Sequence, residues 1–295
     1  MKKAYITKNF SASTMATIDQ ANAIIEDYLA DGLNLTLRQL YYQFVARDLF
    51  ENKQLNYDRL GRIISDARLT GLVDWDAIVD RTRKLEKNSH WDSVRSILRS
   101  CAYGYRRDVW ADQPNRVEVW IEKQALTGII LRPCEELDVP YFACRGYVSQ
   151  SEQREAGMRA LRNWDRHAQR TIILHLGDHD PSGVDMTRDN DERLEMFTCE
   201  EFSGLVDMRR IALNMEQIRK YSPPPNPTKL TDSRAPEYIS KYGRDSWELD
   251  ALEPRVLDAL IRDHIDQIVD DELMEKAVAI QESERQTIMS LAAEH

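Results

Sequence analysis

Three aspartates crowd into the short segment LHLGDHDPSGVDM, directly after an apolar run. Asp178 and Asp180 are separated by one residue, His179, and Asp185 lies five positions after Asp180. Carboxylates this close repel one another, so the crowding needs a cation or a structural reason. In an extended chain residues i and i+2 point the same way, so Asp178 and Asp180 could share one ion.

A further acid, Glu122, ends the apolar segment RVEVWIEK. If both segments are strands of one parallel sheet, their carboxyl ends lie at the same edge, which is where ligands bind in such sheets. Oxygen ligands without His or Cys suit Mg²⁺ or Mn²⁺, ions that act on phosphate esters. We therefore expect Glu122, Asp178 and Asp180 to bind one divalent ion, with Asp185 either supporting these ligands or binding a second ion. A D-x-D pair also occurs in helix caps and solvated turns, and the spacing alone leaves that alternative open.

The part of the chain from Arg116 onward alternates between strand and helix patterns. RVEVWIEK, VPYFACRG, RTIILHLGD and VDMRRIAL read as strands, with amphipathic helical segments between them. This alternation predicts an α/β fold with a parallel sheet and covering helices. Pro181 suits the first turn of the helix after the third strand, and Gly183 permits a close backbone approach there. Two more helices are expected around 254–268 and 270–293.

The first part of the chain reads as short helices. Helices are expected from Ser13 to Ala30, from a capping box at Thr36 and Gln39, and from about Tyr57 to Leu69. The stretch LVDWDAIVDRTR that follows is expected to form a short strand or wing. Three short helices followed by a strand pair are typical of winged-helix DNA-binding domains, which is an analogy at the level of the fold.

The helix predicted from Thr36 carries the segment TLRQLYYQF. At about 100° per residue, Tyr41 lies near the centre of an apolar arc, whereas Tyr42 lies outside its middle and beside Arg38. Tyr41 is therefore expected in the core and Tyr42 as a displayed phenol. A neighbouring arginine can hold a phosphate and favour the phenolate, which a phenol with a pKa near 10 needs for attack. A tyrosine pair on an amphipathic helix is also ordinary packing, and that alternative stays open.

Charge is unevenly distributed along the 295 residues, although the formal net charge is -10. From Tyr57 to Arg107 there are 11 Lys and Arg against 7 Asp and Glu, whereas from Lys241 onward there are 6 against 14. The first region could follow DNA phosphates, and a solvated surface accounts for the charges equally well. The side chains expected to contact DNA are Arg59, Arg62 and Arg68.

Cysteine usage and hydropathy exclude other classes of protein. Four cysteines are far apart and form no CxxC pair, so neither a zinc knuckle nor a disulfide framework is indicated. They are Cys101, Cys134, Cys144 and Cys199. The sequence has no apolar run of membrane-spanning length and no signal-peptide pattern, and we expect a cytoplasmic protein without membrane contacts.

Two segments together carry a resemblance to a known family. VEVWIEK followed by LGDHDPSGVDM resembles the Toprim domain of the topoisomerase VI A subunit and of the related meiotic double-strand-break transesterase. That family has a strand-ending Glu and a D-x-D-P-x-G-x-D-[IM] segment. Upstream, TLRQLYYQF resembles the R-x-[LI]-Y-Y motif of the same family. The matching residues are Glu122, Asp178, Asp180, Pro181, Gly183, Asp185 and Met186.

The resemblance covers roughly residues 33–255 and implies a specific architecture. It implies an N-terminal helical, winged-helix-like domain followed by a Toprim-type parallel-sheet α/β domain. The expected divisions are an N-terminal helix over 1–32, a winged-helix-like tyrosine domain over 33–110, a Toprim domain over 111–255 and acidic C-terminal helices over 256–295. Glu248 and Asp250 fall where the family closes its Toprim core, and they either support the site or are solvated acids at a helix start.

The resemblance also implies a reaction and partners. Tyr42, aided by Arg38, would attack a phosphodiester of duplex DNA with Mg²⁺ or Mn²⁺ and stay joined to a 5′ end. The tyrosine of one protomer would face the metal site of the other, so a homodimer is expected. The topoisomerase needs an ATPase subunit, and since this chain has no P-loop motif, strand passage would need that partner in trans.

Three other functions remain as alternatives to a DNA-cleaving transesterase. A Toprim nuclease would use metal-activated water and leave the tyrosine idle. A non-catalytic homologue would bind DNA and keep the fold. A phosphatase of the D-x-D type would use its first Asp as nucleophile, but it accounts for neither Glu122 nor the upstream tyrosine helix.

Overall fold

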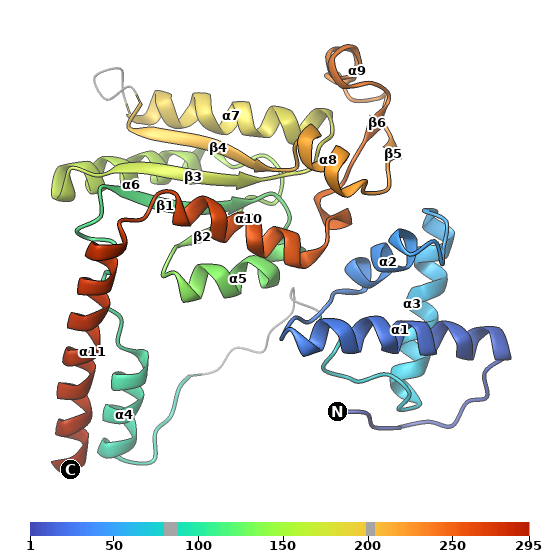
Figure 1. The fold of residues 1–295 in the computed structure, drawn as a ribbon, viewed down its shortest axis with the longest axis horizontal. Coiled ribbons are helices and arrows are strands. Elements are labelled where there is room, and N and C mark those ends of the chain that lie inside the picture. The colour runs from blue at the N-terminus through green and yellow to red at the C-terminus, as the bar shows by residue number, and fades with distance from the viewer. Residues whose placement is uncertain (80–87, 199–203, 295) are drawn as a thin grey trace.

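A computed structural model describes residues 1–79, 88–198 and 204–294. It shows a helical body at the N-terminus, a parallel sheet with helices on both faces, and a projecting pair of helices (Figure 1). The α/β class predicted from the sequence is therefore confirmed. Among the described residues, no helix is both long and apolar enough to cross a membrane.

Three helices form the N-terminal body around one apolar core. They are α1 (Ala12–Ala30), α2 (Leu37–Ala46) and α3 (Gln54–Leu69). The capping box predicted at the start of α2 is present, because Thr36 accepts from the Gln39 backbone while the Gln39 side chain accepts from Thr36. Helix α3 begins three residues earlier than expected. Its N-cap residue Lys53 is held by a tertiary bond, donating its backbone N–H to the Tyr41 hydroxyl at 2.8 Å.

The expected wing is not a strand where it is described. Residues 72–79 make a single isolated bridge, Leu35 with Ile78, and residues 80–83 lie outside the described part of the chain. Helix α4 (Val94–Gly104) then packs against the last helix, α11 (Asp271–Glu294), far from α1 to α3 (Figure 1). The segment expected as one domain, residues 33–110, thus contributes to two bodies of the structure.

Four parallel strands form the central sheet in the order β2-β1-β3-β4. They are β1 (Asn115–Ile121), β2 (Tyr141–Ala143), β3 (Arg170–Leu176) and β4 (Val206–Ala212). The intervening helices are α5 (Thr127–Glu136), α6 (Gln150–His167) and α7 (Pro181–Thr198), with a short turn η1 (Gln124–Leu126) before α5. Successive side chains of each strand point to opposite faces of the sheet, so each strand contributes to an apolar core on both faces. Val119 and Leu174 belong to one core, and Trp120 and Ile173 to the other.

The remaining elements close the sheet and extend from it. They are α8 (Met215–Tyr221), β5 (Asn226–Pro227), α9 (Ala235–Tyr242), β6 (Asp245–Ser246), η3 (Leu249–Ala251), α10 (Pro254–Asp266) and α11. Helix α10 covers the same sheet face as α5, and β5 and β6 form a small antiparallel ladder. The two C-terminal helices predicted from the sequence are confirmed as α10 and α11.

Candidate functional site

The carboxyl ends of β1 and β3 bring together the acids that the sequence places there. Glu122 follows β1 directly, and its Oε2 accepts the backbone N–H of Asp178 at 2.9 Å. Asp180 begins the turn into α7, where its Oδ1 accepts from the Gly183 backbone at 2.6 Å and from Ser182. A side chain at position 183 would collide with the Asp178 carbonyl oxygen, so this turn requires glycine. The predicted close backbone approach is therefore confirmed.

Burial makes the charges of the first two acids costly. Desolvation, with the nearby Asp178 charge, raises the pKa of Glu122 to about 7. Burial also raises the pKa of Asp178, although the Lys123 ammonium opposes that effect. Both carboxylate oxygens of Asp178 are bound by other groups of the same chain. Its Oδ1 accepts from the Leu249 backbone at 2.7 Å, and its Oδ2 lies 2.8 Å from Lys123 Nζ.

Two more acids reach the same place from the segment after β6. Glu248 is half-buried and Asp250 is only 4% exposed. Burial raises the pKa of Asp250 to about 6. Its Oδ1 is buried and has no hydrogen-bond partner among the described residues. The sequence offered these residues as supports or as solvated acids, and the structure places both beside Asp178.

The positive charge at the centre of this acidic cluster comes from Lys123, which the sequence analysis overlooked. Its ammonium lies 2.8 Å from Asp178, 3.2 Å from Glu248 and 3.9 Å from Asp250. Burial alone would lower the pKa of Lys123, but these carboxylates raise it above the usual value, so the side chain stays charged. The position of Lys123 in the sequence could have pointed to this role, because a lysine directly after a strand-ending acid must lie at the same edge of the sheet.

Arg210 and His179 hold the turn that carries Asp178 and Asp180. The Arg210 guanidinium donates to the carbonyl oxygens of Gly177, Asp178 and Gly183 at 2.6–3.0 Å. The His179 ring bonds to the Tyr238 hydroxyl at 2.7 Å, and its backbone pairs with Trp247. Through these contacts both residues hold the backbone of the turn that carries Asp178 and Asp180. The sign of this role in the sequence was an arginine near the end of a predicted strand, directly before the apolar residues Ile211 and Ala212.

Helix α2 lies against the acidic cluster of the same chain. Arg38 approaches Glu248 at 3.3 Å and Asp250 at 3.9 Å, and Tyr42 lies one helical turn after Arg38. Arg38 and Tyr42 line a pocket of about 380 Å³ together with the acids Asp178, Asp180 and Glu248. The other lining residues include Tyr41, Asn52, Gln54, Tyr57, Asn226, Pro227, Lys229, Ser246 and Trp247. The predicted tyrosine, arginine and D-x-D acids thus meet in one cavity of a single chain.

The expectation of a displayed Tyr42 is wrong. Tyr41 and Tyr42 are both 4% exposed. Tyr41 is anchored to the α2–α3 connection through Lys53, as expected for a core side chain. Tyr42 is covered because η3 and its flanking residues pack on the second face of α2. Burial and the Glu248 charge raise the pKa of Tyr42, outweighing Arg38, so the phenol is protonated at neutral pH.

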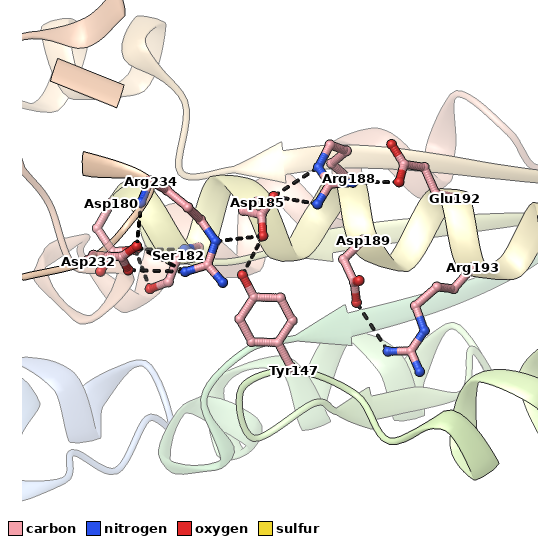
Figure 2. Close-up of polar contacts among 11 residues, drawn as sticks. Tyr147, Asp180, Ser182, Asp185, Arg188, Asp189, Glu192, Arg193, Asp232 and Arg234 are labelled. Atoms are coloured by element: carbon pink, nitrogen blue, oxygen red, sulfur yellow. Dashed lines mark hydrogen bonds and ion pairs between the residues drawn. The ribbon is translucent and has the colours of Figure 1, made fainter. Parts of the chain in front are cut away.

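Asp185 is not part of this cavity, contrary to its expected role at the metal site. It projects from the outer side of α7 and is held by Tyr147, Arg188 and Arg234, as Figure 2 shows. Burial would raise the pKa of Asp185, but the hydrogen bonds from Tyr147 and Arg188 lower it below the usual value. Both carboxylate oxygens are therefore engaged by protein donors. Helical rotation explains the difference, because the α7 turn carries Asp185 away from Asp180.

The three predicted DNA-contacting arginines have different surroundings. Arg59 and Arg62 are exposed on α3, on the side turned away from Tyr57. Arg68 is half-buried, donates to the Trp75 carbonyl oxygen at 2.7 Å and stacks over the Trp75 ring. Arg68 thus fixes the local fold, whereas the exposed pair can reach a ligand.

The donor set suits a hard divalent cation in chemistry, whereas in this structure the cation that contacts Asp178 is the Lys123 ammonium. Glu122, Asp178 and Asp180 are the residues that would hold Mg²⁺ or Mn²⁺, and the unpartnered Asp250 Oδ1 indicates negative charge not yet matched. In the described ranges, however, no three or more His, Cys, Asp or Glu side chains converge in ligating positions. Lys123 would have to leave Asp178 for such convergence.

The two bodies meet around this pocket mainly through polar contacts. Outside the pocket, Tyr28 donates to Glu253 at 3.3 Å, and within its lining Asn52 donates to Asn226 at 2.9 Å. Arg255 forms an ion pair with Asp27. Such an interface resembles a transient protein contact more than a core, and it favours relative motion of the bodies.

Comparison with known proteins adds no relative, because neither a scan of protein-family models nor a search of curated proteins finds a match to this chain.

The raised pKa of Glu122 predicts a pH-dependent stability. An acid whose pKa is higher in the folded state destabilises the fold when it ionises. Relative to Glu122→Gln, the wild-type free energy of unfolding should therefore fall as pH rises from about 4.5 to 7, by up to about 1.4 kcal/mol per pH unit. Urea unfolding of both proteins across this range measures the difference. A difference that stays constant or grows in favour of the wild type would contradict the assignment.

Proposed function

We propose that this chain is a metal-dependent DNA-cleaving transesterase similar to the A subunit of type IIB topoisomerases. In this proposal the parallel sheet is a Toprim-type domain and the N-terminal helices act as a winged-helix-like tyrosine domain. The observation that carries the proposal is the pocket where Tyr42, Arg38 and the D-x-D acids meet. The sequence resemblance that joins the same three features supports it independently.

The pocket offers a nucleophile with a proton acceptor beside it. Tyr42 and Glu248 line the same pocket, so a carboxylate is available there to accept the phenol proton. In the proposed step Tyr42 Oη bonds to the phosphorus of a backbone phosphodiester while its proton passes to Glu248. The bond from phosphorus to the 3′ oxygen breaks, and that oxygen takes up a proton from solvent. The products are a 5′ phosphotyrosine and a free 3′ hydroxyl.

The cations of the pocket would hold the reacting phosphate. Arg38 is positioned to contact a phosphate beside Tyr42, and its ion pair with Glu248 fixes that position. A divalent ion on Glu122, Asp178 and Asp180 would neutralise charge that develops on the phosphate oxygens. Once displaced from Asp178, Lys123 would be a further cation in reach of the DNA backbone. Arg59 and Arg62 are the proposed contacts with flanking phosphates of duplex DNA.

One observation favours a second function, a Toprim nuclease that uses metal-activated water. Tyr42 is buried and its pKa is raised, which are the properties of a structural tyrosine. In that case the acids cleave DNA without a covalent intermediate. The two functions differ in whether the cleaved end carries protein.

Substitution of the two tyrosines separates these functions. Labelled duplex DNA incubated with the protein and Mn²⁺ should give a covalent adduct that migrates with the protein after denaturation. Tyr42→Phe removes one oxygen and should lower adduct formation by a factor on the order of 10³ or more. The matched control is Tyr41→Phe, which removes the neighbouring hydroxyl and should leave the adduct nearly unchanged. Cleavage by Tyr42→Phe that releases free ends would instead establish the nuclease.

The pocket also predicts that Tyr42 acts on the acids of its own chain. The resemblance implies a tyrosine that faces the partner's metal site, whereas here both groups lie in one chain. Tyr42→Phe and Asp178→Asn chains, coexpressed with different tags and purified as a mixed assembly, should therefore fail to form the adduct. Adduct formation by the mixed assembly, with each variant alone inactive, would show that the pocket is completed in trans.

A further inference from the structure

Helices α4 and α11 form an antiparallel arm that projects from the sheet (Figure 1). Hydrogen bonds near the base join the two helices: Tyr105 donates to Glu284 at 2.8 Å, and the Arg107 backbone donates to Gln281 at 2.7 Å. The first turns of α11 are anchored in the main core through Ala277. Beyond that residue α11 packs on α4 rather than on the sheet.

The arm leaves much of its own apolar surface uncovered. Helix α4 carries apolar side chains at i, i+3, i+4, i+7 and i+8, the pattern of a helix that buries one face. They are Val94, Ile97, Leu98, Cys101 and Ala102, and of these only Ala102 is fully buried. Val94 is 64% exposed, and Leu291 near the end of α11 is 49% exposed. A pair of helices gains its stability from such faces, so this arm is incomplete by itself.

The charges of the two helices are opposite. Helix α4 contains Arg95 and Arg99 and no acidic residue, and both arginines are exposed. Helix α11 contains six Asp and Glu against one Lys and one Arg. In the described part of the chain, no ion pair is found for Arg95 or Arg99. The arm therefore presents a basic helix and an acidic helix side by side.

We propose that the arm is a self-association surface on which the arm of a second copy docks. A two-fold axis would place α4 of one chain against α11 of the other, and the opposite charges would then pair twice. The four helices would enclose the apolar residues Val94, Ile97 and Leu291 from both chains, as in a four-helix bundle. This inference goes beyond the proposed function and holds whether or not Tyr42 cleaves DNA.

Mass measurement by light scattering tests the arm directly. The wild type should have twice the chain mass of 34.3 kDa, while Val94→Asp combined with Leu291→Asp should have the single-chain mass at the same concentration. The matched control is Leu230→Asp, because Leu230 is a leucine that is 77% exposed on a loop outside the arm. It should remain a dimer.

A second variant, which changes only surface charges, tests the dimer interface if the variant with Val94→Asp and Leu291→Asp folds poorly. Arg95→Glu with Arg99→Glu changes only exposed side chains and should raise the dimer dissociation constant by about tenfold or more. High salt should weaken the wild-type dimer and have less effect on this variant. A wild type of any mass other than twice the chain mass, or a dimer that withstands both sets of substitutions, overturns the proposal.

Discussion

The ammonium of Lys123 is the interaction on which the site and the joint between the two bodies depend. It contacts Asp178 from the end of β3 and Glu248 from the segment after β6, with Asp250 slightly farther away. Buried carboxylates are costly without a partner, and removal of such a partner is strongly destabilising. Through Glu248 the same network reaches Arg38 on α2, one helical turn before Tyr42. One half-buried cation thus links the sheet, the C-terminal segment and, through Glu248, the helical body.

For the proposed reaction, this arrangement sets the stability of the fold against access to Tyr42. The contacts that hold Tyr42 also bury it and keep its phenol protonated. A long nucleic acid reaches such a group only if the bodies separate, and the polar contacts between them make separation less costly than opening an apolar core would be. Lys123 acts as the internal counter-ion of Asp178 and Glu248 in this arrangement.

The local features of the fold could be predicted from the sequence because they depend on neighbouring residues. The capping box at Thr36, the strand ends at Glu122 and Asp178, and the glycine at 183 follow from spacing and backbone geometry. Burial of Tyr42 could not be predicted in this way, since the residues that cover it lie about 200 positions later in the chain. The packing of α4 on α11 could not be predicted for the same reason, because the two helices are far apart in the sequence.

The errors at single side chains have equally specific causes. Asp185 matches a motif position, but Arg188 and Arg234 approach its carboxylate, and one of them comes from a distant loop. Lys123 was overlooked because a lysine beside one acid gives no sign of the acids that converge on it from residues 248 and 250. The stretch from 72 to 79 alternates like a strand, yet among the described residues it finds only an isolated bridge to Leu35.

The most direct measurement is a crystal structure with Mn²⁺ and its anomalous-difference density, because it shows whether the acidic pocket exchanges the ammonium for a divalent ion. We predict a peak about 2.1 Å from oxygens of Asp178 and its acidic neighbours Glu122 and Asp180, with Lys123 moved away from Asp178. A pocket without anomalous density, in which Lys123 Nζ still bonds to Asp178, would contradict it.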